Sequence, residues 1–126
     1  MIKGIDGILL GSSNAKKLAD FYKTKVGLKL TGEYEMGDKN TDLYIFELKG
    51  CGLYIMDHSK VKGKNQQPGR FILNLEVDDL AKEVKKLVSA KVKVIQDIYH
   101  VEDYGKVATF EDVDGNYFQF VQVKGK

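Results

Sequence analysis

The chain repeats itself at an offset of about 64 residues, and this repeat restricts its fold more than any other feature. Phe46-Glu47 corresponds to Phe110-Glu111, and Leu28-Lys29-Leu30 corresponds to Val92-Lys93-Val94, both at an offset of 64 residues. A repeat of this length predicts two similar modules rather than a solenoid, whose repeats span about 20–50 residues. We expect a single domain of residues 1–126 with module 1 at about 1–58, a linker at 59–69 and module 2 at about 70–126.

The first half has the pattern of a strand, a helix and three further strands. Ser13 or Asn14 can cap the helix, because a short side-chain oxygen accepts an otherwise unpaired backbone N–H. Gly27 is a plausible helix stop, since glycine tolerates a positive φ. The helix carries Leu18, Phe21, Tyr22 and Val26 at helical spacing, and the expected strands are Ile5 to Ser12, Leu28 to Met36, Asp42 to Leu48 and Leu53 to Asp57.

The second half predicts the same order of elements. Asp78 or Asp79 can cap a helix with an apolar stripe of Leu80, Val84, Leu87 and Val88. In the turn from Val113 to Asn116, Gly and Asn accept positive φ, and the Asp114 carboxylate can bond backbone N–H groups two residues on. The expected strands are Phe71 to Val77, Val92 to Tyr99, Lys106 to Glu111 and Tyr117 to Val123.

Composition excludes several classes of partner. The 20 basic and 18 acidic residues are interspersed, and Arg70 is the only arginine, which argues against nucleic-acid binding. No apolar run approaches the ~20 residues of a membrane-spanning helix, so we expect no membrane association. Cys51, the only cysteine, cannot form an intramolecular disulfide, which favours a reducing, cytoplasmic compartment.

Three motifs in this order resemble the vicinal oxygen chelate superfamily, which includes glyoxalase I, extradiol dioxygenases, fosfomycin-resistance enzymes and bleomycin-resistance binding proteins. The first is Leu18 to Tyr22 followed by Val26-Gly27-Leu28, the second is Leu75 to Leu80, and the third is Phe110 to Asn116 with Val113 where the family usually has proline. The resemblance covers the full length. It implies an α+β fold of two tandem βαβββ modules, with a curved mixed sheet and the helices on its convex side.

In metal-using members of this superfamily, four side chains on the concave face hold a divalent ion that stabilises negative charge on the substrate. Carried over to this chain, the four positions fall on Gly7, Tyr54, Ile72 and Gln119. Gly7 and Ile72 have no ligating side chain, and an ion needs three or four strong ligands. We therefore expect neither an inherited metal nor a cofactor.

Three other residues are weaker candidates for chemistry. His58 follows Asp57, and His100 lies near Glu102 and Asp103, so one alternative is a metal site unlike the family's. The alternative is that both are exposed loop histidines. Cys51 lies between two glycines without an activating histidine nearby in sequence, which favours an ordinary turn or buried cysteine over a reactive thiol.

Strand alternation predicts a concave face of mixed character that suits a small-molecule pocket with a few orienting polar groups. Tyr54 and Tyr117 could stack on a flat ligand, and Asn74 and Gln119 supply neutral donors and acceptors. The alternative is an ancestral cavity filled by its own side chains. The predicted pocket residues are Gly7, Leu9, Tyr54, Met56, Ile72, Asn74, Tyr117 and Gln119.

Three functions follow as hypotheses. The first is a metal-free protein of the resistance or sequestration type that binds a small, partly aromatic molecule. The second is a divalent-metal-dependent enzyme with relocated ligands, which would be a glyoxalase-like lyase, an isomerase or a dioxygenase. The third is a ligand-free dimerisation domain. The resemblance also implies a homodimer, and the sequence favours binding over catalysis without identifying catalytic residues.

Overall fold

The computed structural model describes residues 1–36 and 41–125, which divide into two compact units, Met1–Gly63 and Lys64–Lys126. Each unit has the order strand, helix, three strands, so the predicted α+β fold of two tandem βαβββ modules is confirmed. The predicted turn Gly37 to Asn40 lies outside the described residues.

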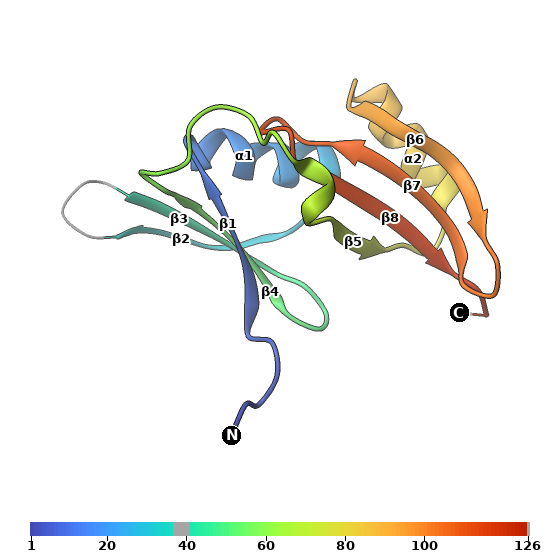
Figure 1. Cartoon of the computed structure of the whole chain (residues 1–126), viewed down its shortest axis with the longest axis horizontal. Coiled ribbons are helices and arrows are strands. Elements are labelled where there is room, and N and C mark those ends of the chain that lie inside the picture. Colours follow the sequence, from blue (N-terminus) through green and yellow to red (C-terminus); the bar gives the residue numbers. More distant parts are fainter. Residues whose placement is uncertain (37–40, 126) are drawn as a thin grey trace. The chain divides into compact units, whose positions relative to one another are not determined.

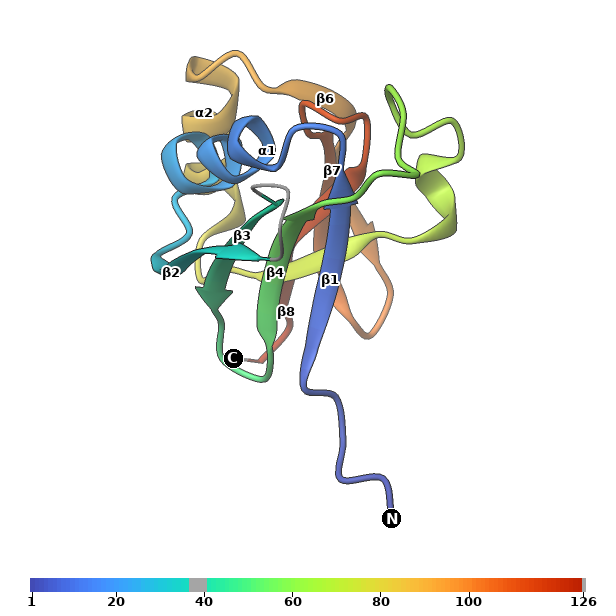
Figure 2. The same ribbon diagram turned by 90° about the vertical axis from the view of Figure 1, so that its left-hand side faces the viewer.

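The first unit contains a four-stranded mixed sheet in the order β1-β4-β3-β2. β1 is parallel to β4, and the other neighbours are antiparallel; Figure 2 shows β1 and β4 side by side. The elements are β1 Gly7–Ser12, α1 Ala15–Phe21, the π-helical turn η1 Tyr22–Val26, β2 Leu30–Met36, β3 Thr41–Glu47 and β4 Gly52–Asp57.

The second unit repeats this topology with the order β5-β8-β7-β6 (Figure 1). β5 is parallel to β8, and the remaining pairs are antiparallel. The elements are the 3-10 turn η2 Pro68–Arg70, β5 Leu73–Glu76, α2 Leu80–Ser89, β6 Lys93–Val101, β7 Gly105–Glu111 and β8 Tyr117–Val123. The predicted strands Val92 to Tyr99 and Phe71 to Val77 therefore differ from β6 and β5 by one or two residues at each end.

In each unit, the buried face of the sheet carries the apolar residues that the alternation predicts. On β4, Leu53 and Ile55 are fully buried, and Tyr54 between them is only half-buried. On β8, Phe118 and Phe120 are buried, and Gln119 between them is half-buried. Phe110, Phe118 and Phe120 pack with ring centroids 5.6 to 6.0 Å apart. Burial of such side chains stabilises a fold by about 1.5–3 kcal/mol each. One face of each sheet is thus committed to the core, and the other remains available.

Both helices begin at the predicted caps. The Asn14 side chain accepts from the Lys17 N–H at 3.1 Å, and the Asp79 carboxylate accepts from the Lys82 N–H at 3.2 Å. The first helix continues as η1 to Gly27, whose φ of +90° ends it as predicted.

A side chain from the last strand of each module also holds the start of the module's helix. In the first unit, Asp57 Oδ1 accepts from the Ala15 N–H at 2.8 Å, and Asp57 Oδ2 accepts from the Asp42 N–H at 3.1 Å. In the second unit, Gln122 Oε1 accepts from the Leu80 N–H at 2.9 Å. The repeat therefore extends to a contact that fixes each helix to its sheet.

The final turn is held by a carboxylate that the sequence analysis did not single out, that of Asp112. The buried Asp112 Oδ1 accepts from the N–H groups of Asp114 and Asn116, at 2.9 and 3.0 Å. Gly115 has the positive φ, +80°, and Asn116 does not share it. The second half of the predicted linker is bound to this turn, since the Asn65 N–H donates to the Asp114 carbonyl at 2.8 Å.

None of the helices in the described part of the chain combines the length and apolar character needed to cross a bilayer.

The hydrogen bonds of Asp57 and Gln122 should stabilise the fold in proportion to their number, two for Asp57 and one for Gln122. Asp57→Ala should lower the free energy of unfolding by about 2 kcal/mol, because two buried or half-buried N–H groups lose a charged acceptor. Gln122→Ala should cost about 1 kcal/mol, because it removes one neutral hydrogen bond. Urea unfolding of both variants, with the exposed Asp20→Ala as a charge-matched control, measures the difference. Equal costs for Asp57→Ala and Asp20→Ala would contradict this role.

The buried Tyr44 should make the free energy of unfolding depend on pH in the alkaline range. Burial and the neighbouring Asp42 carboxylate, 3.3 Å from the hydroxyl, raise the pKa of Tyr44 from 10.0 to about 12. The folded state then holds this proton more tightly than the unfolded chain, so the associated stability is complete below pH 10 and is lost as the pH rises toward about 12. Tyr44→Phe should flatten the fall in unfolding free energy across that window, whereas the exposed Tyr34→Phe should not. Identical pH profiles for the two variants would refute the assignment.

Candidate functional site

A pocket of about 430 Å³ lies within the second unit. Three of the predicted residues meet there: Ile72, just before β5, and Tyr117 and Gln119 on β8. Its volume is within the range typical of small-molecule sites. The lining residues are Ile72, Ile95, Gln96, Tyr99, Thr109, Tyr117 and Gln119.

Strand register aligns three polar lining residues, Gln96, Thr109 and Gln119, with Asn74 in one row across the sheet. Asn74 pairs with Gln119, Gln119 with Thr109, and Thr109 with Gln96, so the row crosses β5, β8, β7 and β6. Residues opposite one another on paired strands share a face and contact each other. We call this set the amide row.

A hydrogen bond fixes the centre of the amide row. Gln119 Nε2 donates to Thr109 Oγ1 at 2.9 Å, and Thr109 is only 5% exposed. The Gln119 amide therefore has one N–H and its carbonyl oxygen left for other partners. The residues at both ends of the row, Asn74 and Gln96, are exposed, and Asn74 is not among the pocket residues.

Irregular pairing of β6 brings in residues that sequence reasoning missed. The β6–β7 register shifts between Val94 and Gln96, and again between Gln96 and Tyr99. Strict alternation would send the consecutive residues Ile95 and Gln96 to opposite faces, yet both line the pocket. β-Bulges re-aim side chains in this way and are frequent near functional sites.

Of the missed residues, only Thr109 had a usable sequence signal. Given the predicted strands Lys106 to Glu111 and Tyr117 to Val123, an antiparallel hairpin places Thr109 opposite Gln119. No glycine or proline marks the bulges of β6, so nothing in the local sequence points to Ile95, Gln96 or Tyr99.

The four predicted pocket residues of the first unit lie on β1 and β4, and a tyrosine ring covers part of that face. Leu9 on β1 pairs with Tyr54 on β4, and Gly7 pairs with Gly52. Met56 lies two residues further along β4. A Cβ added at Gly7 would collide with Tyr54 Cε2, so the ring lies directly over this glycine. Leu9 is exposed and Met56 is half-buried. Gly7 is thus needed for close approach of the Tyr54 ring.

Asp6 anchors the Tyr54 ring. The Tyr54 hydroxyl donates to Asp6 Oδ2 at 3.3 Å. The negative charge of Asp6 raises the pKa of Tyr54 above its usual 10.0, with a smaller contribution from desolvation. The phenol therefore stays protonated at neutral pH.

The four positions to which the resemblance assigns metal ligands supply few side-chain donors. Gly7 and Ile72 have no ligating side chain and the Tyr54 hydroxyl donates to Asp6, which leaves the carbonyl oxygen of Gln119, whose Nε2 donates to Thr109. Elsewhere in residues 1–36 and 41–125, no group of three or more His, Cys, Asp or Glu side chains is placed to hold a metal ion.

None of the remaining sequence candidates is among the lining residues of the pocket. His58 is exposed after β4, and its Nδ1 accepts from the Lys60 N–H at 3.1 Å. His100 is exposed within β6 rather than in a loop, because that strand extends to Val101. Cys51 is half-buried beside β4.

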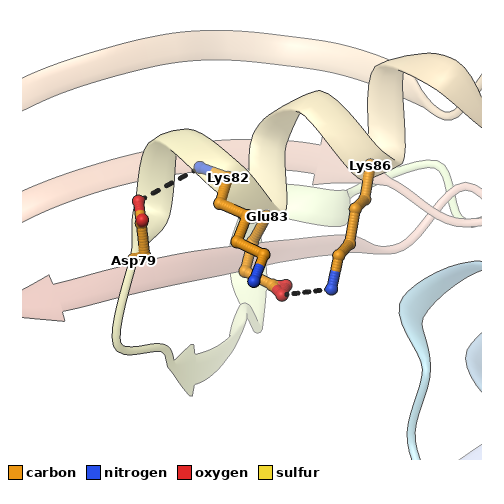
Figure 3. A network of polar contacts seen from close by, with 4 residues as sticks. All are labelled: Asp79, Lys82, Glu83 and Lys86. Carbon is orange, nitrogen blue, oxygen red and sulfur yellow. Dashed lines mark hydrogen bonds and ion pairs between the residues drawn. The ribbon is translucent and has the colours of Figure 1, made fainter.

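A larger depression of about 820 Å³ runs along the outer side of α2 but has no features of a built site. It is lined mainly by lysine, alanine and serine, and two of its residues have structural roles (Figure 3). Asp79 caps the helix, and Lys86 forms an ion pair with Glu83 at 3.2 Å. Exposed ion pairs of this kind contribute little to stability.

Comparison with protein families decides the classification. A family model described as Glyoxalase/Bleomycin resistance protein/Dioxygenase superfamily matches residues 4–120, nearly the whole chain. The chain belongs to this superfamily. A comparison with curated protein sequences finds no match.

Several solved structures share the fold of this superfamily member. An antibiotic-binding protein, TnmS3 from Streptomyces sp. CB03234, has a TM-score of 0.74 at 22% identity, covering 98% of both chains. A glyoxalase family protein from Enterococcus faecalis has a TM-score of 0.76 at 19% identity, covering 95% of this chain and 98% of that one.

A third structure is a variant of the fosfomycin resistance protein FosX from Listeria monocytogenes, in complex with Mn(II) and 1S,2S-dihydroxypropylphosphonic acid. It has a TM-score of 0.73 at 14% identity, covering 99% of this chain and 94% of that one. At these identities the likeness shows a shared fold and nothing about the ligand.

Because the Tyr54 ring lies against Gly7, a methyl group added at position 7 should move the ring and change the pKa of Tyr54. Gly7→Ala should displace the ring from Asp6 and lower the pKa of Tyr54 toward 10.0, because the carboxylate then no longer stabilises the protonated phenol. Titration of the Tyr54 ¹³Cζ signal by NMR measures this pKa. Gly69→Ala is the control, since its Cβ would meet open space. An unchanged Tyr54 pKa in Gly7→Ala would show that the ring does not depend on this glycine.

Proposed function

We propose that this protein binds a small, partly aromatic molecule in the pocket of the second unit, in the manner of a resistance or sequestration protein and without an inherited metal. The observation that carries the proposal is the convergence of two tyrosines, two glutamines and a buried threonine in a pocket of about 430 Å³. Apolar and aromatic walls with a few fixed polar groups are typical of such sites.

The chemistry of the lining favours binding over catalysis. General acid–base or nucleophilic catalysis needs an ionisable or activated group beside the substrate. The pocket offers tyrosine hydroxyls, amides and one threonine hydroxyl, which accepts from Gln119. These groups orient a ligand, and none of them is paired with a histidine or carboxylate among the lining residues. The name of the similar TnmS3 structure, an antibiotic-binding protein, agrees with this reading.

Tyr99 gives the proposal a matched test. Tyr99 lines the pocket and Tyr104 does not, yet both side chains are 40% exposed, so their removal should affect folding similarly. Thermal-shift titration with planar aromatic antibiotics and metabolites should find ligands that raise Tm. Tyr99→Ala should weaken their binding about tenfold, because aromatic contacts add about 0.5–1.5 kcal/mol beyond area burial. Tyr104→Ala should leave binding unchanged.

Three outcomes would count against this function. If no compound raises Tm, or if Tyr104→Ala weakens binding as much as Tyr99→Ala, the pocket is not the binding site. If elemental analysis of the purified protein finds a stoichiometric divalent metal whose removal abolishes ligand binding, the metal-free part of the proposal is wrong.

A further inference from the structure

The pocket of the second unit is lined entirely by uncharged residues. Its polar groups are the amides of Gln96 and Gln119, the hydroxyl of Thr109 and the hydroxyls of two tyrosines. No Lys, Arg, His, Asp or Glu is among the lining residues. Although 30% of the chain is charged, no charged side chain lines this pocket to pair with an ionic ligand.

The two rows that flank the amide row also supply no unpaired cation. In the row on one side of the amide row, Tyr117 pairs with Glu111, which pairs with Lys93. Lys93 Nζ and Glu111 Oε2 lie 3.5 Å apart and compensate each other. In the row on the other side, Glu76 pairs with Val121, so the remaining charge there is negative. An anionic ligand would therefore meet no unpaired cation along these rows.

The amide row offers both kinds of hydrogen-bonding group. Gln119 uses one N–H for Thr109, and Gln96 Nε2 contacts the Asp97 carbonyl at 3.4 Å. Each amide still has a carbonyl oxygen to accept and an N–H to donate. A ligand edge that carries a carbonyl beside an N–H or O–H can satisfy both, whereas a carboxylate or phosphonate leaves the glutamine oxygens facing negative charge.

We propose that this pocket selects uncharged planar molecules, of the aromatic amide, imide or phenol class, and rejects carboxylates and phosphonates. The selection is made by Gln96, Gln119 and Thr109, with Tyr99 and Tyr117 contacting the ring. This inference rests on the proposed function and adds the chemical class of the ligand. The β6 bulges are essential to it, because they turn Gln96 and Tyr99 toward the pocket.

The test uses two probes that have nearly the same shape and differ in charge, 2-naphthamide and 2-naphthoate. Each is titrated into ¹⁵N-labelled protein at pH 7, and the side-chain NH₂ signals of Gln96 and Gln119 report occupancy directly. We expect 2-naphthamide to shift both signals. We expect 2-naphthoate to bind at least about tenfold more weakly, because its charge would be desolvated without a partner.

A charge introduced into the pocket should change this preference. Gln119→Lys places a cation in the amide row, so the ratio of amide to acid affinity should fall at least to unity. Gln66→Lys makes the same change in net charge at an exposed loop residue outside the pocket, and should keep the wild-type ratio.

The possible results distinguish a wrong ligand class from a wrong proposed function. Equal or tighter binding of 2-naphthoate by the wild-type protein, at the same glutamine signals, would overturn the ligand class and leave the pocket as a binding site. No shift of Gln96 or Gln119 by either probe would overturn both. The wild-type comparison decides between these outcomes even if Gln119→Lys does not fold.

Discussion

The pairing of β8 with both β5 and β7 determines which side chains line the pocket of the second unit. β8 is parallel to β5 and antiparallel to β7, and this double pairing brings Asn74, Gln119 and Thr109 into register. The same pairing directs Phe118 and Phe120 into the core, so the strand cannot slip by one residue without exposing them. The hydrophobic effect on one face of the sheet thus fixes the polar row on the other.

Most of the fold could be predicted from the sequence because its signals are local or repeated. The repeat offset, the caps at Asn14 and Asp79, and the stop at Gly27 each depend on residues close together in the chain. The contacts that were not predicted join distant residues. Asp57 reaches the start of α1 across 42 positions, and nothing local distinguishes it from an exposed carboxylate at a strand end.

The candidate site was predictable only where the strands are regular. Alternation correctly grouped Tyr117 and Gln119 on β8, but the bulges of β6 have no sequence signature, so the three lining residues on that strand were missed. In the first unit, the glycine at position 7 was recognised as a missing ligand but not as space for the Tyr54 ring, since that contact depends on side-chain direction. The implied homodimer and the cytoplasmic location stay predictions.

The central claim is that a small aromatic molecule occupies the pocket of the second unit. Intermolecular nuclear Overhauser effects between bound 2-naphthamide and ¹³C-labelled isoleucine methyl groups test it most directly, because Ile72 and Ile95 line this pocket and Ile5 and Ile8 belong to the first unit. We predict contacts from the naphthalene protons to Ile72 and Ile95. Contacts to Ile5 or Ile8 without any to Ile72 and Ile95 would contradict the account.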